Sequence, residues 1–359
     1  MKTGPAHYLI QLSKKEAGGK MIKVKVEDAV GMVLAHDLTK IVPGKFKGAA
    51  FKKGHIVQAT DIEELKNIGK NYLYILPFSE EQVHENEAAR RIAVAASSDK
   101  LNVLEPLEGK ANIRPAYRGL LKIKQETLSE LNQLGEIALV TLHNNTLVEA
   151  DQPAAAAKII PLVIAREKIQ TVEEICRKKG PVIDIKPLFP LKTGIVITGS
   201  EVYYGRIEDR FGEALRKKVN YYGGEVFDLR YAPDDLDFIA KQIRELLEKG
   251  AEVILLSGGM AVDADDITPQ AIREIATELV TYGLPVLPGA MCMVAYHRQV
   301  PIIGIPACAM FSRTTILDII LPRLLAKEHL RKEDLFSLAH GGMCLQCDLC
   351  RYPACPFGK

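Results

Sequence analysis

From about residue 190 onward, short apolar segments alternate with longer amphipathic segments. The apolar segments are typical of buried strands, and the longer ones are typical of helices that connect one parallel strand to the next. Such connections are right-handed and place helices against a sheet. We therefore expect an α/β fold, a doubly wound and mostly parallel sheet with helices on both faces. The expected strands are GIVITG (194–199), EVFDLRYA (225–232), AEVILL (251–256) and VPIIGIP (300–306), and the expected helices cover 207–223, 234–250 and 312–326.

The preceding region lacks this regularity, and we expect an α+β arrangement there. The sequence therefore predicts three parts: an α+β region at 1–190, the α/β domain at 191–330 and a cysteine-rich tail at 331–359. Within the first part, the predicted elements are strands over 22–26 and 72–76, helices over 59–69, 88–96 and 117–135, a hairpin over 136–151 that turns at Asn144–Asn145, and a proline-containing linker over 183–192.

The charge and hydropathy of the chain exclude several kinds of partner. A net charge of +2 over 359 residues gives no general electrostatic attraction to nucleic acids or to anionic membranes. No apolar run approaches the roughly 18 residues that a membrane-spanning helix needs. The N-terminal residues lack the apolar core of a signal peptide. We expect a cytoplasmic protein with no nucleic-acid and no membrane partner.

Glycines, hydroxyls and carboxylates follow the expected parallel strands. Ligands of an open parallel sheet bind outside the carboxyl ends of its strands, so we expect these residues to share one edge. Any one of these loops is more often a simple turn or a solvated loop, and only their combination favours a binding site. The candidate residues are Thr198, Gly199, Ser200 and Glu201 after the first strand, Asp234 after the second, Ser257, Gly258, Gly259, Asp263, Asp266 and Thr268 after the third, and Pro306 after the fourth.

This edge has the composition of a phosphate and Mg²⁺ site. Gly258 and Gly259 would let backbone N–H groups approach an anion closely. Thr268 as N-cap, with Pro269 at the first helical position, would start a helix whose positive end faces the same anion. Carboxylates beside an anion require a cation between them, and Mg²⁺ serves this purpose. The sequence contains neither GxxxxGK[ST] nor GxGxxG, which excludes the commoner nucleotide-binding motifs.

Three stretches of the α/β domain resemble a known family. TGSEVYYGRIEDRF (198–211), APDD (232–235) and SGGMAVDADDITPQAI (257–272) are similar to the molybdopterin-binding domain of molybdenum-cofactor biosynthesis proteins, over 194–326. More weakly, VEDAVGMVLAHDLTK (26–40) resembles the amino-terminal region of molybdopterin molybdotransferases. The resemblance implies molybdopterin as ligand or substrate, with Mg²⁺ and molybdate or tungstate as further partners. It also implies a homo-oligomer.

The same resemblance assigns roles to three acidic residues. Asp266 matches the active-site aspartate of the family's Gly-Gly loop, Asp234 the acidic residue after the second strand, and Glu201 the acidic residue of the first loop. It implies that Asp266 and Asp234 are catalytic, hold Mg²⁺ and orient metal transfer or phosphoanhydride cleavage.

Two loops depart from the family's pattern. Pro306–Ala309 reads PACA where the family usually has Pro-Gly-Asn-Pro, and Pro288–Met291 reads PGAM where transferases carry Pro-Gly-Lys-Pro. Two hypotheses therefore stand. In the first, the chain is an enzyme of molybdenum or tungsten cofactor biosynthesis that inserts the metal into the pterin dithiolene with Mg²⁺. In the second, it is a non-catalytic carrier of molybdopterin or a redox or metal sensor, with molybdoenzymes or other cofactor-assembly proteins as partners. Hydrolysis of a nucleotide pyrophosphate on the same domain type is a third, weaker interpretation.

The tail contains four closely spaced cysteines, Cys344, Cys347, Cys350 and Cys355. The first three have the spacing of ligands in bacterial ferredoxins, and Cys355-Pro356 is similar to the final Cys-Pro of that motif, with one more intervening residue. In a chain without an export signal, such spacing favours metal ligation over disulfides. We expect a [4Fe–4S] cluster, with a four-thiolate Zn²⁺ site as the alternative.

Overall fold

The structure is a computed structural model that describes residues 22–42, 46–76, 81–260 and 266–359. The domain boundaries expected at residues 190 and 330 stay predictions. By its internal contacts the chain forms two compact units. Unit one contains Met1–Arg114, Lys124–Thr141 and Pro153–Val182, and unit two contains Pro115–Ile123, Leu142–Gln152 and Ile183–Lys359.

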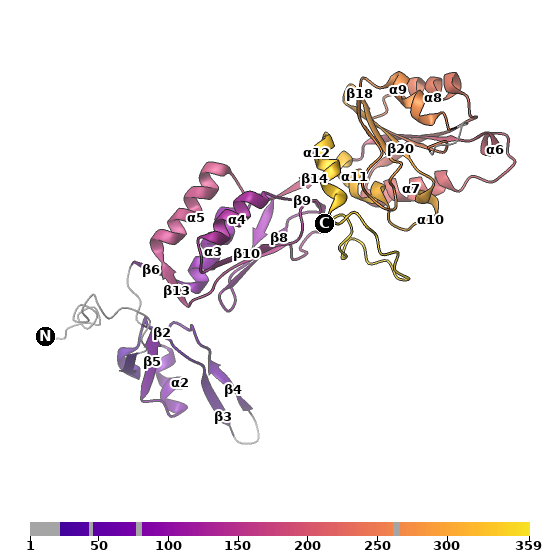
Figure 1. Ribbon diagram of the computed structural model, residues 1–359. Helices are drawn as coiled ribbons and strands as arrows, with labels where there is room; N and C mark the ends of the chain where they lie inside the picture. The colour runs from indigo at the N-terminus through magenta and orange to yellow at the C-terminus, as the bar shows by residue number, and fades with distance from the viewer. Residues whose placement is uncertain (1–21, 43–45, 77–80, 261–265) are drawn as a thin grey trace. The chain divides into compact units, whose positions relative to one another are not determined.

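The first part of unit one is a small α+β structure (Figure 1, indigo). Its antiparallel sheet has the order β1-β5-β2, and β3 and β4 form a hairpin. The predicted strands near 22–26 and 72–76 and the predicted helix near 59–69 are confirmed. The elements are β1 (Ile22–Lys25), η1 (Val26–Asp28), β2 (Val33–Leu34), β3 (Leu38–Val42), β4 (Phe46–Phe51), α2 (Asp61–Asn67) and β5 (Tyr72–Leu76).

The remainder of unit one combines a four-stranded antiparallel sheet, of order β10-β12-β8-β7, with three helices. β6 pairs with β13, and Arg91 of α3 forms an ion pair with Glu173 of α5 at 2.8 Å. The elements are β6 (Gln82–His84), α3 (Glu85–Ala96), β7 (Leu101–Val103), β8 (Lys110–Pro115), α4 (Gln125–Gln133), β10 (Ile137–Thr141), β12 (Ala155–Ile159), β13 (Val163–Ala165) and α5 (Arg166–Lys179).

Three expectations for this stretch of sequence are wrong. The predicted helix over 117–135 begins with a strand, β9 (Gly119–Ile123), and only α4 is helical. The predicted hairpin does not form, because β10 pairs with β12 while β11 (Leu147–Val148) pairs with β9. The predicted linker contains β14 (Ile183–Pro187), an edge strand in the sheet β11-β9-β14. Pro187 is tolerated there because it ends an edge strand.

A six-stranded sheet forms the centre of unit two and confirms the predicted α/β fold. Its order is β16-β15-β17-β20-β19-β18; the first four are mutually parallel, and β19 runs antiparallel to both neighbours. The strands are β15 (Lys192–Thr198), β16 (Glu225–Ala232), β17 (Val253–Ser257), β18 (Glu278–Tyr282), β19 (Met293–His297) and β20 (Val300–Ile305).

Helices cover both faces of this sheet because successive strand side chains point to opposite sides. Ile195 and Ile197 of β15 face α7 (Phe211–Tyr222) and α11 (Ile316–Leu325). Val196, between them, faces α8 (Leu236–Glu248) and α9 (Thr268–Ile275). Figure 1 shows α8 and α9 on one side of the sheet and α7 and α11 on the other. The shorter elements of the unit are α6 (Ser200–Tyr203), α10 (Cys308–Phe311), α12 (Lys332–Phe336) and η2 (Ser337–Ala339).

A charge cluster around the buried carboxylate of Glu328 joins the sheet β11-β9-β14 to the α/β domain. Glu328 accepts from Lys122 of β9 at 2.7 Å, from Lys186 of β14 at 2.9 Å and from Arg323 of α11 at 2.8 Å. Burial alone raises the pKa of a carboxyl group, but these three cations outweigh burial and lower the pKa of Glu328 to about 2. Glu328 is therefore ionised over the whole physiological pH range.

Within the described parts of the chain, no helix is both long enough and apolar enough to cross a membrane.

Candidate functional site

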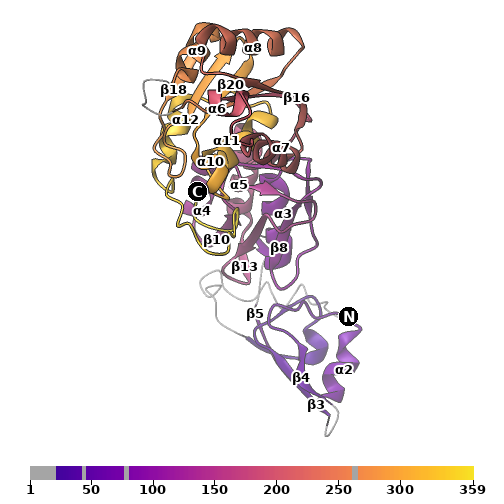
Figure 2. The same ribbon diagram turned by 90° about the vertical axis from the view of Figure 1, so that its right-hand side faces the viewer.

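The carboxyl ends of β15, β16, β17 and β20 lie at one edge of the sheet because these four strands are parallel neighbours. α6 follows β15 at this edge, and α10 follows β20. Both short helices lie on the side of the domain that faces the viewer in Figure 2. The loops that the sequence analysis singled out therefore share one edge, as expected for a ligand site on an open parallel sheet.

The first and second loops are joined by a reciprocal pair of hydrogen bonds. The backbone N–H of Ser200 donates to Asp234 Oδ2 at 2.8 Å, and the backbone N–H of Asp234 donates to Ser200 Oγ at 3.1 Å. The next residue, Asp235, caps α8 by accepting from the N–H of Phe238 at 2.8 Å. One carboxylate oxygen of Asp234 thus positions the first loop, and the carboxylate is half-buried.

The first and third loops are joined by buried hydroxyl groups. Thr198 Oγ1 lies 2.9 Å from Thr268 Oγ1 and donates to the Ser257 carbonyl at 3.3 Å. Ser257 Oγ in turn donates to the Ile305 carbonyl of β20 at 3.4 Å. The three hydroxyl-bearing residues are buried. They fix the strand ends relative to one another and leave ligand contact to the backbone and to more exposed groups.

The expectation that Thr268 is the N-cap of α9 is wrong. The N-cap is Ile267, which makes no side-chain capping bond, and Thr268 is the first helical residue. The hydroxyl of Thr268 is used by Thr198 instead. Pro269 is therefore the second helical residue and not the first, which the sequence predicts, although it still lies in the first turn.

The three glycines of the edge have backbone conformations that favour glycine, and two of them are also closely packed. Gly199, Gly258 and Gly259 have φ values of 137°, 106° and 51°, which favour glycine. A Cβ on Gly258 would collide with the Thr198 carbonyl, and one on Gly259 would lie 2.9 Å from Thr268 Oγ1. The backbone of the Gly-Gly loop therefore lies directly against the end of β15.

The acidic candidates lie in different environments. Asp266 is half-buried, and its Oδ1 would lie 3.6 Å from a Cβ on Gly259. Burial, and then the negative charge of Asp266, raise the pKa of Tyr282, whose hydroxyl donates to the Met260 carbonyl at 3.1 Å. Glu201 is exposed on α6. Asp263 lies outside the described residues. Tyr282 belongs to no motif and could not be identified from the sequence.

Pro306 is buried at the end of β20, and Cys308 begins α10 in a half-buried position. Burial raises the pKa of the Cys308 thiol. This thiol is therefore neutral at physiological pH and is not a ready metal ligand. The structure places this fourth loop at the same edge as the other three.

Among the residues that the structure describes, no group of three or more His, Cys, Asp and Glu side chains is placed to hold a metal ion. For the predicted Mg²⁺ site, Asp234 and Asp266 are the described carboxylates. In proteins Mg²⁺ is commonly held by one or two carboxylates together with phosphate oxygens of the substrate. The donor chemistry of this edge therefore fits Mg²⁺ when a bound ligand supplies phosphate oxygens.

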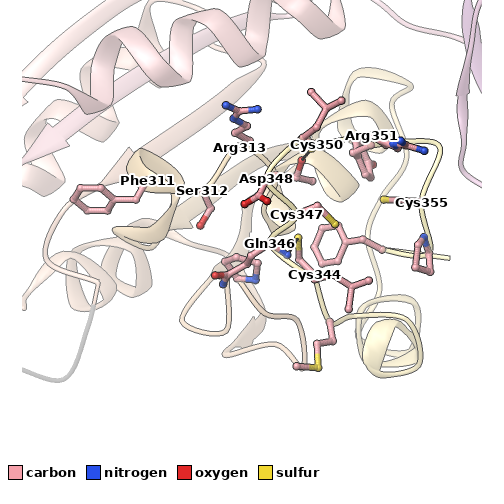
Figure 3. Close-up of a pocket in the computed structure, with 18 residues that line it drawn as sticks. Phe311, Ser312, Arg313, Cys344, Gln346, Cys347, Asp348, Cys350, Arg351 and Cys355 are labelled. Atoms are coloured by element: carbon pink, nitrogen blue, oxygen red, sulfur yellow. Dashed lines mark hydrogen bonds between the residues drawn. The ribbon is translucent and has the colours of Figure 1, made fainter.

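A second candidate site lies at the tail, where all four cysteines line one cavity of about 520 Å³ (Figure 3). Cys344, Cys350 and Cys355 are partly exposed, Cys347 is exposed, and all are free thiols. Segment 311–314, which begins at the last residue of α10, also lines this cavity. The cysteines thus share a cavity without being gathered around one point.

Two of these thiols take part in hydrogen bonds. The N–H of Gln346 donates to Cys344 Sγ at 3.4 Å, and Thr314 Oγ1 lies 3.1 Å from Cys350 Sγ. The hydroxyl of Thr314, followed by the N–H of Tyr352, lowers the pKa of Cys350. Hydrogen bonds to sulfur stabilise a thiolate, the form that binds metals.

The tail is anchored to the α/β domain. Phe357 is buried in the core beneath α7 and α11, and Tyr352 donates to the Asp318 carbonyl of α11 at 3.0 Å. The tail carbonyl of Gly342 accepts from the N–H of Leu287 at 2.8 Å, and the N–H of Cys344 donates to the Leu287 carbonyl at 2.8 Å. These contacts anchor the tail to this domain at its start and near its end.

Comparison with known proteins gives two family matches. Residues 194–326 match a family described as "Probable molybdopterin binding domain", and residues 23–77 match one described as "Domain of unknown function (DUF8806)". The first match covers the stretches in which the sequence resembles that family.

Curated relatives match over a short segment. A CinA-like protein of Mycobacterium tuberculosis is 37% identical over 90 residues, which cover 25% of this chain and 21% of the relative. A CinA-like protein of Mycolicibacterium gilvum is 35% identical over 81 residues, which cover 23% of this chain and 19% of the relative. The chain spans about a fifth of the length of these relatives.

Solved structures are similar to part of the chain. The molybdopterin biosynthesis enzyme MoaB of Thermus thermophilus is 22% identical, with a TM-score of 0.34, and the match covers 38% of this chain and 98% of that one. The tungsten cofactor synthesizing protein MoaB of Pyrococcus furiosus is 17% identical, with a TM-score of 0.32. This match covers 38% of this chain and 98% of that one.

Proposed function

We propose that this chain binds molybdopterin and acts in molybdenum or tungsten cofactor biosynthesis, because residues 194–326 match the molybdopterin-binding family. The ligand site is the carboxyl edge of β15, β16, β17 and β20. The observation that carries this proposal is the joining of three loops at that edge by the Ser200–Asp234 and Thr198–Thr268 contacts. Such contacts prepare a site before the ligand arrives, which reduces the ordering cost of binding.

Backbone groups carry the recognition of the pterin's phosphate in this proposal. Gly258 and Gly259 present N–H groups without side chains, and Gly199 does the same in the first loop. α9 directs its amino terminus to the same edge and adds a favourable dipole for an anion. The exposed carboxylate of Glu201 would contact the more polar, uncharged part of the ligand.

The finer proposal is Mg²⁺-dependent insertion of molybdate or tungstate into the pterin dithiolene. Asp266 and Asp234 would hold Mg²⁺ together with the ligand's phosphate, and the ion would neutralise the charge that develops during transfer. Asp234 is held in place for this role by Ser200. Ala290 stands where transferases carry a lysine.

The alternative is a carrier or sensor that binds molybdopterin without turnover. It is favoured by a specific observation: the tail makes backbone hydrogen bonds to Leu287, next to the altered Pro288–Met291 loop. We propose that the four tail cysteines hold a [4Fe–4S] cluster, with Zn²⁺ as the alternative. Support comes from their spacing, their shared cavity and the hydrogen bonds to Cys344 and Cys350. Binding requires the thiols to converge from their present positions.

We further propose a cytoplasmic homo-oligomer that delivers its pterin to molybdoenzymes or to other cofactor-assembly proteins. The oligomeric state and the delivery partners rest on the family resemblance alone, and the cytoplasmic location rests on the sequence features described above.

Asp266→Asn separates the enzyme from the carrier. The purified chain is incubated with molybdopterin, Mg²⁺ and molybdate, and pterin binding and metal-loaded product are measured. For an enzyme, Asp266→Asn should abolish product formation and leave pterin affinity within about threefold of the wild type, because the lost interaction belongs to the transition state. If wild type and variant both bind pterin and neither forms product, the carrier or sensor function is correct.

A further inference from the structure

The two loops that depart from the transferase pattern are also the loops that adjoin the cysteine tail. The first is Pro288–Met291. Leu287, immediately before it, makes backbone hydrogen bonds to Gly342 and Cys344 of the tail, both at 2.8 Å. Pro288 itself lines the cysteine cavity. The backbone of Cys344, a candidate metal ligand, is thus hydrogen-bonded to the residue that precedes this loop.

The second loop, Pro306–Ala309, continues through α10 into the wall of the same cavity. Phe311, Ser312, Arg313 and Thr314 line that wall. Thr314 Oγ1 lies 3.1 Å from Cys350 Sγ. Along the chain, only Met310–Arg313 lie between this loop and Thr314, whose hydroxyl contacts the candidate metal ligand Cys350.

Both paths meet at the amino terminus of α11, which is closely packed. The N–H of Ile316 donates to the Pro288 carbonyl at 3.1 Å, and a Cβ on Gly289 would collide with the Ile316 side chain. Asp318 accepts from the N–H of Thr315 at 2.7 Å and from Lys218 at 2.6 Å. A densely bonded terminus of this kind transmits a displacement of one loop to the other.

Metal binding must displace these contacts. A compact four-thiolate centre requires sulfur atoms within about 2.3 Å of its metal. The cysteines of the described structure are not gathered in this way. Convergence therefore moves Cys350 relative to Thr314 and Cys344 relative to Leu287.

We infer that metal occupancy of the cysteine tail controls the affinity of the strand-end site for molybdopterin, through Leu287–Met291 and Pro306–Thr314. This inference rests on the proposed pterin function. Metal binding moves the cysteine segment and, through these contacts, both loops, so the pterin pays a smaller cost of rearranging the loops in the metal-loaded chain. Coupling of this kind is reciprocal, and molybdopterin must strengthen metal binding by the same factor.

The test compares the full chain in two states. One sample is loaded with Zn²⁺ or reconstituted anaerobically with iron and sulfide, and its metal content is measured. The other is depleted with chelator under reducing conditions. Molybdopterin affinity is then measured for both by equilibrium dialysis with pterin fluorescence. We expect the loaded chain to bind at least about fivefold more tightly, which is the lower end of typical allosteric coupling.

Thr314→Val tests the path, because it removes the hydroxyl that contacts Cys350 and nearly preserves side-chain shape. We expect the metal-loaded and the metal-depleted forms of this variant to bind molybdopterin with nearly equal affinity. Ser312→Ala is the matched control, since it removes a hydroxyl from the same cavity wall, and it should keep the wild-type ratio. Should Thr314→Val fold poorly, Zn²⁺ titration of the wild type with and without saturating molybdopterin gives the reciprocal measurement.

The outcomes separate the two proposals. Equal or weaker pterin binding by the metal-loaded chain overturns the coupling and leaves pterin binding standing. A chain that takes up no metal at the tail overturns the coupling in the same way. Absence of pterin binding in both states overturns the proposed function together with the coupling.

Discussion

The strand-end edge and the cysteine tail are two polar regions of one unit, and they are built in opposite ways. At the edge, the side chains of Thr198, Ser257 and Thr268 are buried and bonded to one another or to the backbone. In the tail, the chain is anchored near its ends, while Leu349 in the cysteine segment is 68% exposed. A site of the first kind keeps its shape without ligand. A site of the second kind acquires its final shape from what it binds.

The largest expected effect concerns the anchor of the tail. Phe357 is 2% exposed and packs in the core beneath α7 and α11. Phe357→Ala should lower the free energy of unfolding by about 3–5 kcal/mol, the usual cost of removing a buried phenyl group. Thermal or denaturant unfolding followed by circular dichroism measures this loss. Leu349→Ala is the control and should be nearly neutral; an equal loss in both variants would mean that the tail has no localised anchor.

A smaller loss of stability is expected at acid pH. It comes from the Glu328 cluster, which supports the domain that carries both regions. The pKa of Glu328 is about 2 in the folded chain and near its ordinary value of 4.5 when unfolded. Its contribution is therefore present above about pH 4.5 and is lost as the pH falls from about 4.5 toward about 2. Glu328→Gln should be less stable at neutral pH and should lose less stability over that acid range.

Denaturant unfolding at several pH values measures this dependence. Glu213→Gln is the control, because Glu213 is fully exposed and its ion pair with Lys217 on α7 contributes little. A wild type and a Glu328→Gln variant with parallel pH profiles would exclude Glu328 as the source of the acid sensitivity.

The smallest expected effect is a change in the pKa of Tyr282, which tests the contact between Asp266 and Tyr282 at the strand-end edge. The charge of Asp266 helps to raise the pKa of Tyr282, after burial. Asp266→Asn should therefore shift the titration of Tyr282 to lower pH, although burial keeps its pKa above the ordinary value. NMR of ring-labelled tyrosine measures the titration, and Tyr282→Phe assigns the signal. An unchanged pKa would place Asp266 away from Tyr282 in solution.

The α/β sheet could be predicted because each of its parallel strands is followed by a helix within a short stretch of sequence. The sheet β11-β9-β14 could not. Its pairing joins Gly119 to Pro187, far along the chain, and β9 contains leucine and lysine, which also favour a helix. Such long-range pairing overrides local preference.

The location of the site at the strand-end edge could be predicted from the sequence, but the hydrogen bonds within the site could not. The strand-end rule grouped Thr198 with Thr268 and Ser200 with Asp234. The local pattern of threonine before proline suggested an N-cap, whereas the partner of Thr268 is 70 positions away. Similarly, cysteine spacing identified the tail, but the contact between Thr314 and Cys350 depends on the packing of α11 against the tail and leaves no motif.

The central claim is that molybdopterin binds at the Gly-Gly loop of the strand-end edge. The most direct test measures molybdopterin affinity for Gly258→Ala beside Gly250→Ala. Both glycines have positive φ, but a Cβ would meet the Thr198 carbonyl at Gly258 and nothing within 4 Å at Gly250. The account predicts at least about tenfold weaker binding for Gly258→Ala, equivalent to about 1.4 kcal/mol, and wild-type affinity for Gly250→Ala. Wild-type affinity in a folded Gly258→Ala variant, or no molybdopterin binding by the wild type, would contradict it.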